Sequence, residues 1–141
     1  MPAEPKLAEK TLKIILDSNA LLVPLQFKID IFEEIKTLLN VNFEPVLLSP
    51  IRRELERLAS NGSPQMRKKA AYALKLAGKC KSVEVDEEGA VSPDNVIIEV
   101  ASKWKCPVFT NDRQLRKKLR DINVPVIYVR QKSRLEIDGR L

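Results

Sequence analysis

The sequence predicts a three-layer α/β fold, with a central, mainly parallel five-stranded sheet and helices on both of its faces. Short apolar runs rich in β-branched residues alternate with longer segments whose apolar residues recur every three or four positions. This alternation favours a parallel sheet, because parallel neighbours need crossover connections that place helices over the sheet. A chain of 141 residues can bury one good core. We therefore expect a single domain over residues 1–141, with a core at about 13–130, a polar N-terminal leader and a C-terminal tail.

Each predicted strand is a short apolar run that ends at a polar residue or a proline. The first ends at Asp17, as a buried parallel strand would, and the second is stopped by Pro50. The last residues, 133–141, form either a frayed tail or an edge strand. The five predicted strands cover residues 11–18, 44–50, 81–86, 106–112 and 125–132.

The predicted helices have one apolar face and carry start or stop signals at their ends. In the first of them, Ile31, Ile35 and Leu38 recur at helical spacing. Ser63 is the expected N-cap of the third helix, and Gly78 can end it. The five predicted helices cover residues 27–40, about 51–60, 63–79, 92–105 and 112–123.

The composition narrows the classes of function. A net charge of +6 and a pI near 9.4 indicate a polyanionic partner, with nucleic acid ahead of a membrane surface, although lysines also simply keep a surface soluble. No apolar run approaches the roughly 18 residues of a membrane span. The absence of histidine from the sequence excludes a Ser-His-Asp triad and argues against zinc bound by nitrogen and sulfur.

The two cysteines and the N-terminus favour a cytoplasmic protein. Cys80 and Cys106 form no C-x-x-C pair, and the segment MPAEPKLAEK lacks the apolar stretch of a signal peptide. We expect both thiols to be reduced and partly buried, with a disulfide as the alternative for a hyperthermophile.

Four carboxylates recur at strand ends or at the starts of the following helices: Asp17, Glu54, Asp94 and Asp112. Glu54 and Asp94 are expected in first helical turns, where an acid also suits the helix dipole. The carboxyl ends of parallel strands border the crevice where ligands bind, so these acids can converge. Converged carboxylates repel one another unless some are protonated or a divalent cation lies among them. Oxygen-only ligands favour magnesium or manganese over zinc.

The motifs that carry these acids resemble those of PIN-domain proteins, a family of small α/β metal-dependent ribonucleases. The resemblance runs from about Lys13 to Arg130 through the segments ILDSNALL, RRELERL, SPDNVIIEVA and VFTNDRQLRKKLR. TNDRxL after a strand is the most specific of them. The chain looks most similar to archaeal PIN proteins that resemble the PIN nucleases of small-subunit ribosomal RNA processing, and VapC-type toxins look more distant.

The resemblance implies a PIN-like three-layer sandwich and assigns roles to particular residues. Its acidic quartet of catalytic residues and metal ligands falls on Asp17, Glu54, Asp94 and Asp112, with Mg2+ or Mn2+ as the cofactor. Polar residues that orient a carboxylate or a metal-bound water fall on Ser18, Asn19, Thr110 and Asn111. Asp17 and Asp112 are the expected direct ligands, and the other two acids bind directly or through water.

Two of these assignments have alternatives in the sequence. Glu56 lies two residues from Glu54, so a shift of helix register would exchange them. Asp94 is flanked by Pro93 and Asn95, whereas related motifs often carry a second acid there, and the missing charge would weaken a second metal site. Each acid taken alone also has a structural explanation, as a turn residue, a helix cap or a first-turn charge.

Basic residues directly after Asp112 are candidate RNA contacts: Arg113, Arg116, Lys117 and Lys118. Their helix can present positive charge to phosphates near the acids, which would position RNA without reading its sequence. For any one of them a solvated helix face is the alternative. Aromatic residues are scarce and lie at core spacing, so base stacking is not an evident mode of recognition.

Together these features predict a divalent-metal-dependent endoribonuclease that hydrolyses RNA phosphodiester bonds, in ribosomal RNA maturation or RNA turnover. The alternatives are a non-catalytic RNA-binding or scaffold PIN domain, a toxin-type PIN ribonuclease, and a receiver-like phosphoacceptor domain. The last expects adjacent acids after the first strand, where only Asp17 stands. The resemblance implies RNA, a second copy of the chain and ribosome-assembly factors as partners, and no membrane.

Overall fold

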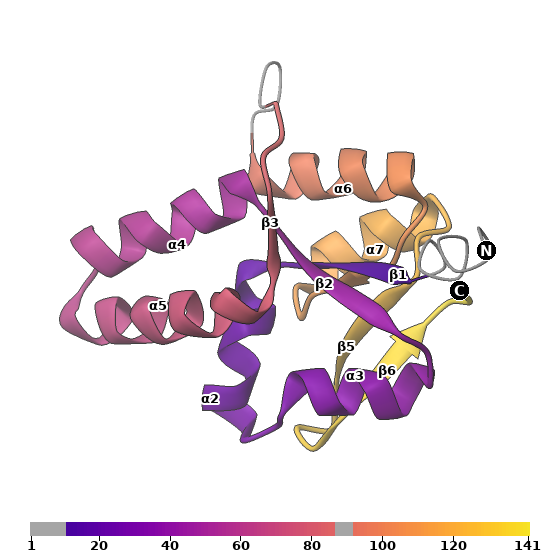
Figure 1. The fold of residues 1–141 in the computed structure, drawn as a ribbon, viewed down its shortest axis with the longest axis horizontal. Coiled ribbons are helices and arrows are strands. Elements are labelled where there is room, and N and C mark those ends of the chain that lie inside the picture. The colour runs from indigo at the N-terminus through magenta and orange to yellow at the C-terminus, as the bar shows by residue number, and fades with distance from the viewer. Residues whose placement is uncertain (1–10, 87–91) are drawn as a thin grey trace, which may run out of the picture.

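The computed structural model describes residues 11–86 and 92–141, which form one six-stranded sheet covered by helices (Figure 1). The predicted N-terminal leader lies almost wholly outside the described residues. The sheet has the order β3-β2-β1-β4-β5-β6. Its strands are β1 (Leu12–Leu16), β2 (Phe43–Leu48), β3 (Lys81–Val83), β4 (Val108–Phe109), β5 (Val126–Arg130) and β6 (Arg134–Asp138). The predicted α/β fold is therefore confirmed.

The sheet has one strand more than the five predicted. Residues 133–141 were open between a tail and an edge strand, and they supply β6, which pairs antiparallel with β5 from Val126↔Asp138 to Arg130↔Arg134. The other pairs are parallel. Leu135 is buried and Ile137 packs against the core, while the alternate residues Arg134, Glu136 and Asp138 are charged. This period of two fixes β6 with its apolar face toward the interior.

The helices cover both faces of the sheet, with α6 and α7 above it and α3 below it in Figure 1. The α-helices are α2 (Val23–Phe27), α3 (Ile31–Leu39), α4 (Ser49–Asn61), α5 (Pro64–Leu76), α6 (Pro93–Trp104) and α7 (Arg113–Asp121). Two short 3-10 helices, η1 (Ser18–Leu22) and η2 (Ala77–Lys79), connect them to their neighbours. No helix of the described part is long and apolar enough to cross a membrane.

Two predicted helix starts were wrong. The helix expected at 27–40 begins at Ile31, because Lys28 adopts a left-handed conformation (φ 57°) that ends α2. The helix expected from about Ile51 begins at Ser49, since a proline is tolerated in the first turn, and Pro50 therefore lies inside α4. As a consequence Glu54 lies in the second turn of α4 and not in the first.

Of the two end signals predicted for the third helix, the start at Ser63 is confirmed and the end at Gly78 is not. The Ser63 hydroxyl accepts a hydrogen bond from the backbone N–H of Met66, which confirms it as the N-cap of α5. Gly78 lies in η2, and Ala77 is the residue that ends α5. Cys80 and Cys106 are both free, as expected, and burial raises the pKa of each thiol to about 11.

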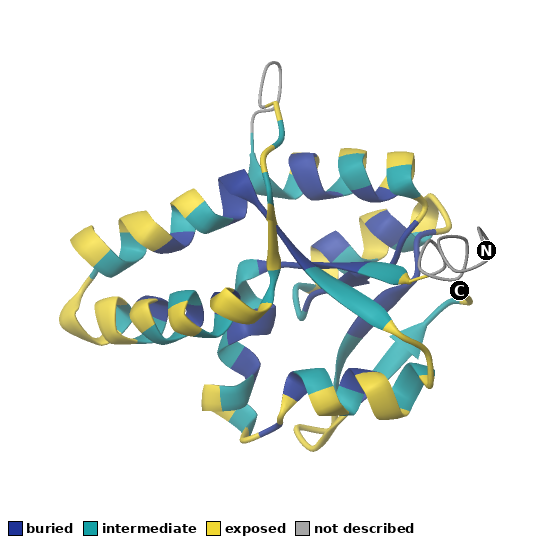
Figure 2. Cartoon of the chain, viewed as in Figure 1, coloured by how far each residue is buried: buried dark blue, intermediate teal, exposed yellow. Residues whose placement is uncertain are grey.

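The core is densest around the middle of the sheet, at β1 and β4 (Figure 2). Ile14, Ile15 and Leu16 of β1 and Val108 and Phe109 of β4 are fully buried. The chain leaves β1 toward β2 on one side and returns to its other side as β4. The carboxyl ends of β1 and β4 thus flank the point where strand order reverses, which is where open α/β sheets bind ligands.

Candidate active site

Asp17 follows β1 directly and is held on both of its carboxylate oxygens. It is 5% exposed. Its Oδ1 accepts a hydrogen bond from the backbone N–H of Ser18 at 2.8 Å. Its Oδ2 accepts two, from the Thr110 hydroxyl at 2.7 Å and from the Asn19 side-chain amide at 3.1 Å. The carboxylate is therefore fixed by residues from the ends of two neighbouring strands.

Thr110 links this acid to the next motif. Its hydroxyl donates to Asp17 and accepts from the backbone N–H of Asp112 at 3.1 Å. The Asn19 side-chain oxygen accepts the backbone N–H of Asn111 at 3.0 Å, and the Asn111 side-chain oxygen accepts the backbone N–H of Val129 at 2.9 Å. The segments after β1 and β4 and the strand β5 are thus fastened together.

The four polar residues predicted around the acids all take part in this region, in different ways. Asn19, Thr110 and Asn111 contribute their side chains. Ser18 contributes its backbone N–H to Asp17. A role for these residues in orienting a metal-bound water stays a prediction.

Asp112 is the N-cap of α7, as the structural explanation of this acid required. Its Oδ1 accepts the backbone N–H groups of Gln114 at 2.9 Å and Leu115 at 3.2 Å. Two bonds to the charged form suit a carboxylate at a helix N-terminus, where the dipole also favours it. Capping uses one oxygen and leaves Oδ2 of this half-buried side chain available.

The remaining two acids approach the same place from α6 and α4. Asp94 lies in the first turn of α6, which is capped by Ser92. Glu54 is half-buried in α4, whereas Glu56 is exposed. Helices α4 and α6 contact each other across this end of the sheet.

Electrostatics connects all four carboxylates. Burial raises the pKa of Asp17, the negative charges of Asp94 and Glu54 raise it further, and the bonds from Thr110 and Ser18 oppose the rise. Burial also raises the pKa of Asp94, which the charge of Asp112 raises further and that of Lys118 lowers. The acids predicted from separate motifs are therefore brought together, and Glu54 rather than Glu56 acts on Asp17.

The chemistry of this donor set suits a hard divalent cation. In the described part of the chain, no three carboxylate or thiol side chains lie close enough together to enclose a metal ion by themselves. Asp17 and Asp112 nevertheless retain acceptor capacity, since Oδ1 of Asp17 accepts one bond and Oδ2 of Asp112 accepts none from residues 11–86 and 92–141. Magnesium usually keeps several waters and takes few carboxylates, so an open set of this kind fits it.

The predicted basic residues divide into two groups. Arg113, Lys117 and Lys118 are exposed on α7. Arg116 is not a solvated cation, which was the alternative to an RNA contact, and its role in binding RNA stays a prediction. Its Nε lies 3.0 Å from Oδ2 of Asp138, and its guanidinium lies 3.7 Å from the centre of the Tyr128 ring.

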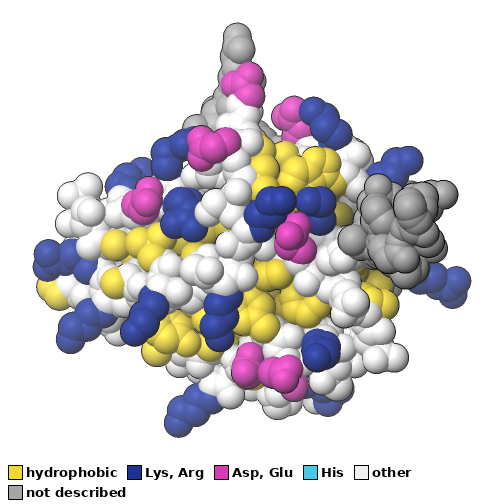
Figure 3. Space-filling model, in the orientation of Figure 1, with side chains coloured by type: hydrophobic (Ala, Val, Ile, Leu, Met, Phe, Trp, Pro, Cys, Tyr) yellow, Lys and Arg dark blue, Asp and Glu magenta, His cyan; other side chains and the backbone are white. Residues whose placement is uncertain are grey.

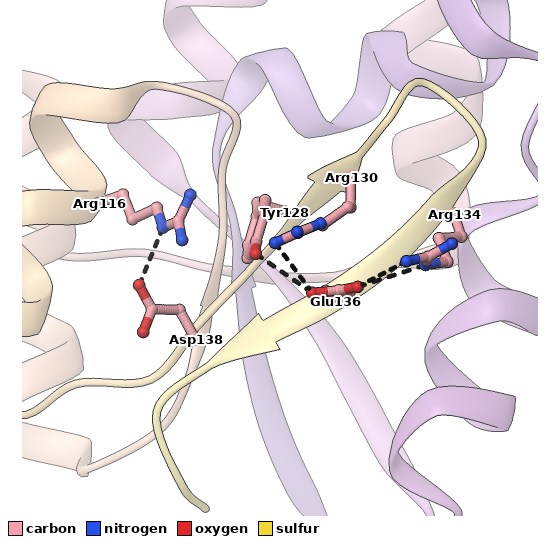
Figure 4. A network of polar contacts seen from close by, with 6 residues as sticks. All are labelled: Arg116, Tyr128, Arg130, Arg134, Glu136 and Asp138. Carbon is pink, nitrogen blue, oxygen red and sulfur yellow. Dashed lines mark hydrogen bonds and ion pairs between the residues drawn. The ribbon is translucent and has the colours of Figure 1, made fainter.

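Sequence reasoning missed the polar network on the β5–β6 hairpin (Figure 4). Glu136 accepts from the Tyr128 hydroxyl at 3.3 Å and pairs with Arg134 at 3.1 Å and Arg130 at 3.6 Å. The alternation of polar and apolar residues in β6 was a signal for this face of the hairpin. The pairing of Asp138 with Arg116 of α7 could not be predicted from this alternation, because the two residues are distant in sequence.

The fold and the acid cluster define an α/β domain with an acidic site at the switch point of its sheet. Residues 14–132 match a family described as a PIN like domain, and the chain belongs to this family. It is 40% identical over 128 residues to ribonuclease VapC4 of Methanocaldococcus jannaschii, covering 90% of this chain and 97% of that protein. It is 29% identical over 118 residues to the rRNA-processing protein fcf1 of Schizosaccharomyces pombe, covering 82% of this chain and 58% of that protein.

Among solved structures, that of the PIN domain endonuclease Utp24 is similar, with a TM-score of 0.76, 26% sequence identity and 92% of each chain covered. The resemblance to PIN-domain ribonucleases, including those of ribosomal RNA processing, is thus confirmed. The VapC-type relative is not more distant in sequence, because its 40% identity exceeds the 29% of fcf1.

Proposed function

We propose that this chain is a single-domain, divalent-metal-dependent endoribonuclease that hydrolyses RNA phosphodiester bonds with Asp17, Glu54, Asp94 and Asp112 as its catalytic acids. The observation that carries the proposal is the geometry at the switch point of the sheet, where Asp17 is buried, is held on both oxygens and is joined through Thr110 to Asp112. The negative charges of Asp94 and Glu54, which raise the pKa of Asp17, support it. A buried carboxylate with a raised pKa among like charges is typical of a functional site. Ribonuclease relatives support the same class of activity.

Mg2+ or Mn2+ would be held by Asp17 and Asp112, with Asp94 and Glu54 binding directly or through water. Such an ion supplies a polarised phosphoryl oxygen and an activated water. The chain's own residues prepare the site. Thr110 and Asn19 fix the direction of Asp17, and the bond from the Asp112 N–H to Thr110 ties the second acid to the first.

The substrate is RNA, and exposed cations near the acids would hold its backbone. Lys118 is exposed on α7 and its charge lowers the pKa of Asp94, which supports a role for this lysine in holding a phosphate at the site. Figure 3 shows further Lys and Arg side chains over the α4–α5 end of the molecule. Since phosphate contacts carry no sequence information, they fit a nuclease whose target is chosen by RNA structure or by partners.

Similarity to fcf1 and Utp24 favours ribosomal RNA maturation as the setting, with ribosome-assembly factors as partners. A toxin-type ribonuclease, for which a homodimer and an antitoxin would be the partners, is the second candidate, because of the 40% identity to VapC4. A purely scaffolding role is disfavoured by the presence of all four acids.

The test is cleavage of mixed RNA substrates with magnesium, with manganese and with EDTA. Asp17→Asn is the control. We expect cleavage by the parent with either metal, none with EDTA and none by the variant. Cleavage in EDTA, or by the variant at the parent rate, would refute the assignment. Growth arrest on expression of the parent but not of Asp17→Asn would favour the toxin-type alternative.

A further inference from the structure

A cavity adjoins the acid site on the side of the β5–β6 hairpin. It has a volume of about 610 Å³, within the roughly 300–1,000 Å³ typical of small-ligand sites. We call it the hairpin pocket. Its walls come from the end of α2, the start of α7, strand β5 and the hairpin turn, and it shares Thr110 and Asn111 with the acid site. A ligand in this pocket would therefore lie next to Thr110, whose hydroxyl binds Asp17.

The charges of the hairpin pocket are all positive. Its charged lining residues are Arg113, Arg116, Arg130 and Lys132, and no acid among the described residues lines it. Asp138 offsets Arg116 and Glu136 partly offsets Arg130. Within residues 11–86 and 92–141, the side chains of Arg113 and Lys132 have no hydrogen-bond or ion-pair partner. Two cations thus remain available to an anionic ligand.

The pocket also offers apolar and amide surface. The ring of Phe27, at the end of α2, is half-buried, and Tyr128 has one ring face occupied by Arg116. Gln26 and Gln131, whose side chains carry amides, also line this cavity. An aromatic ring, amide groups and cations together fit the base and the phosphate of a nucleotide.

The hairpin turn supplies an independent observation. Gln131 and Lys132 are consecutive residues with positive φ, 55° and 61°, in a conformation where glycine is usually favoured. Strained backbone of this kind clusters at functional sites. Both of these residues line the hairpin pocket, so the turn keeps two long polar side chains at the pocket where glycine would fit the backbone better.

We infer that the hairpin pocket binds one nucleotide of the RNA strand next to the cleaved phosphodiester, with its phosphate at Arg113 and Lys132 and its base against Phe27. This inference rests on the proposed function for the identity of the ligand. The inference includes a contact with the base, although the scarcity of aromatic residues in the sequence had argued against base stacking.

The first test measures binding without cleavage. Asp17→Asn protein in EDTA is titrated with a labelled single-stranded RNA over a salt series, by fluorescence anisotropy. Adding Arg113→Ala and Lys132→Ala should weaken binding by about tenfold and lower the log–log salt slope by roughly 0.7 per lost phosphate contact. The matched control, Lys36→Ala with Lys103→Ala, removes the same charge from exposed positions elsewhere and should have a much smaller effect. Equal effects of the two pairs would overturn the inference.

The second test addresses the base. Phe27→Leu should weaken RNA binding by about fivefold or more, because about fivefold is the smallest loss of affinity expected when one base no longer stacks. Binding of an abasic RNA strand should not change. Phe27→Tyr, which keeps the ring, should bind like the parent, and melting curves identify any variant that fails to fold. Equal losses for RNA and abasic strand, or an acidic peptide that competes as well as RNA, would overturn the nucleotide assignment.

Failures of the two proposals are distinguishable. If the parent cleaves RNA with metal but the pocket variants bind like their control, the hairpin pocket fails and the nuclease stands. If the pocket variants lose binding but the parent cleaves nothing, the nuclease fails and the nucleotide pocket stands.

Discussion

Asp17 and Asp112 carry the same carboxylate at the ends of neighbouring strands, but they are held in opposite ways. Asp17 is buried, and its partners Thr110 and Asn19 belong to the ends of two different strands. Asp112 is half-buried and accepts the N–H groups of its own helix. The position of Asp17 therefore depends on the tertiary structure of the sheet, whereas that of Asp112 is set locally by α7.

We expect the greatest loss of cleavage activity when either acid is neutralised. Asp17→Asn and Asp112→Asn should each reduce metal-dependent cleavage by roughly 1,000-fold, about 4 kcal/mol of transition-state stabilisation. Both should fold. An asparagine at position 112 can still cap α7. An asparagine at position 17 removes a buried charge, but its amide group places a donor against the Ser18 N–H, so the two effects oppose each other. The free energy of unfolding of each variant should therefore change by less than about 1 kcal/mol. Turnover and urea unfolding measured side by side check this, and either variant cleaving at the parent rate would contradict it.

Thr110 joins the two acids, so its hydroxyl should matter to both. Thr110→Val removes the hydrogen bond that Oδ2 of Asp17 accepts from the hydroxyl and the one that the backbone N–H of Asp112 donates to it. We expect a loss of about 1–3 kcal/mol in unfolding free energy and of about 10–100-fold in cleavage. Thr110→Ser keeps the hydroxyl and should retain most of both. If valine and serine variants cleave equally well, the hydroxyl does not position Asp17.

A smaller effect is expected from the exposed face of α7. Lys117→Ala with Lys118→Ala should weaken binding of unrelated RNA sequences equally and make the salt dependence shallower, by roughly one counterion per lost contact. Each exposed charge should change stability by no more than about 0.5 kcal/mol. Arg116→Ala should instead lower the melting temperature, because it removes the pair with Asp138 and the contact with Tyr128. Unchanged affinity and slope in the lysine variant would mean that RNA approaches from another face.

The smallest effect is on the pH dependence of stability in EDTA. Burial raises the pKa values of Asp17 and Asp94 above the ordinary 3.8, so the folded state binds protons more readily than the unfolded state. The stability that these neutral acids contribute is fully present below pH 3.8 and is lost as the pH rises through their raised pKa values. Asp17→Asn should therefore gain less stability than the parent when the pH is lowered from 7 toward 4. Parallel curves from urea unfolding would show that Asp17 does not titrate abnormally.

The same contrast explains what the sequence could predict. Asp112 and Ser63 were identified correctly as helix starts, because a cap depends on neighbours within three residues. Asp94 was placed correctly in a first turn for the same reason. The recurrence of acids after strands was enough to bring four distant residues to one end of the sheet, because strand direction determines where strand ends lie.

What could not be predicted depended on long-range contacts or on ambiguous local signals. Lys28 ends α2 in a left-handed conformation that glycine or asparagine would have signalled, and lysine did not. Pro50 suits both the end of a strand and the first turn of a helix, so Glu54 was placed one turn too early. The contacts of Arg116 could not be predicted, because its partners Tyr128 of β5 and Asp138 of β6 are distant in sequence and meet it only in the folded sheet.

If the acids bind a divalent cation as one unit built around Asp17, the stabilisation of the protein by metal should depend on that residue. Melting temperatures of the parent and of Asp17→Asn are measured in EDTA and then with magnesium or manganese. A cation that binds the folded state alone stabilises it by mass action, by about 2.7 kcal/mol at 100 times its dissociation constant. We predict a clear rise for the parent and a much smaller one for Asp17→Asn. Equal rises in the two proteins would mean that the metal binds elsewhere and would refute the assignment of the metal site to Asp17.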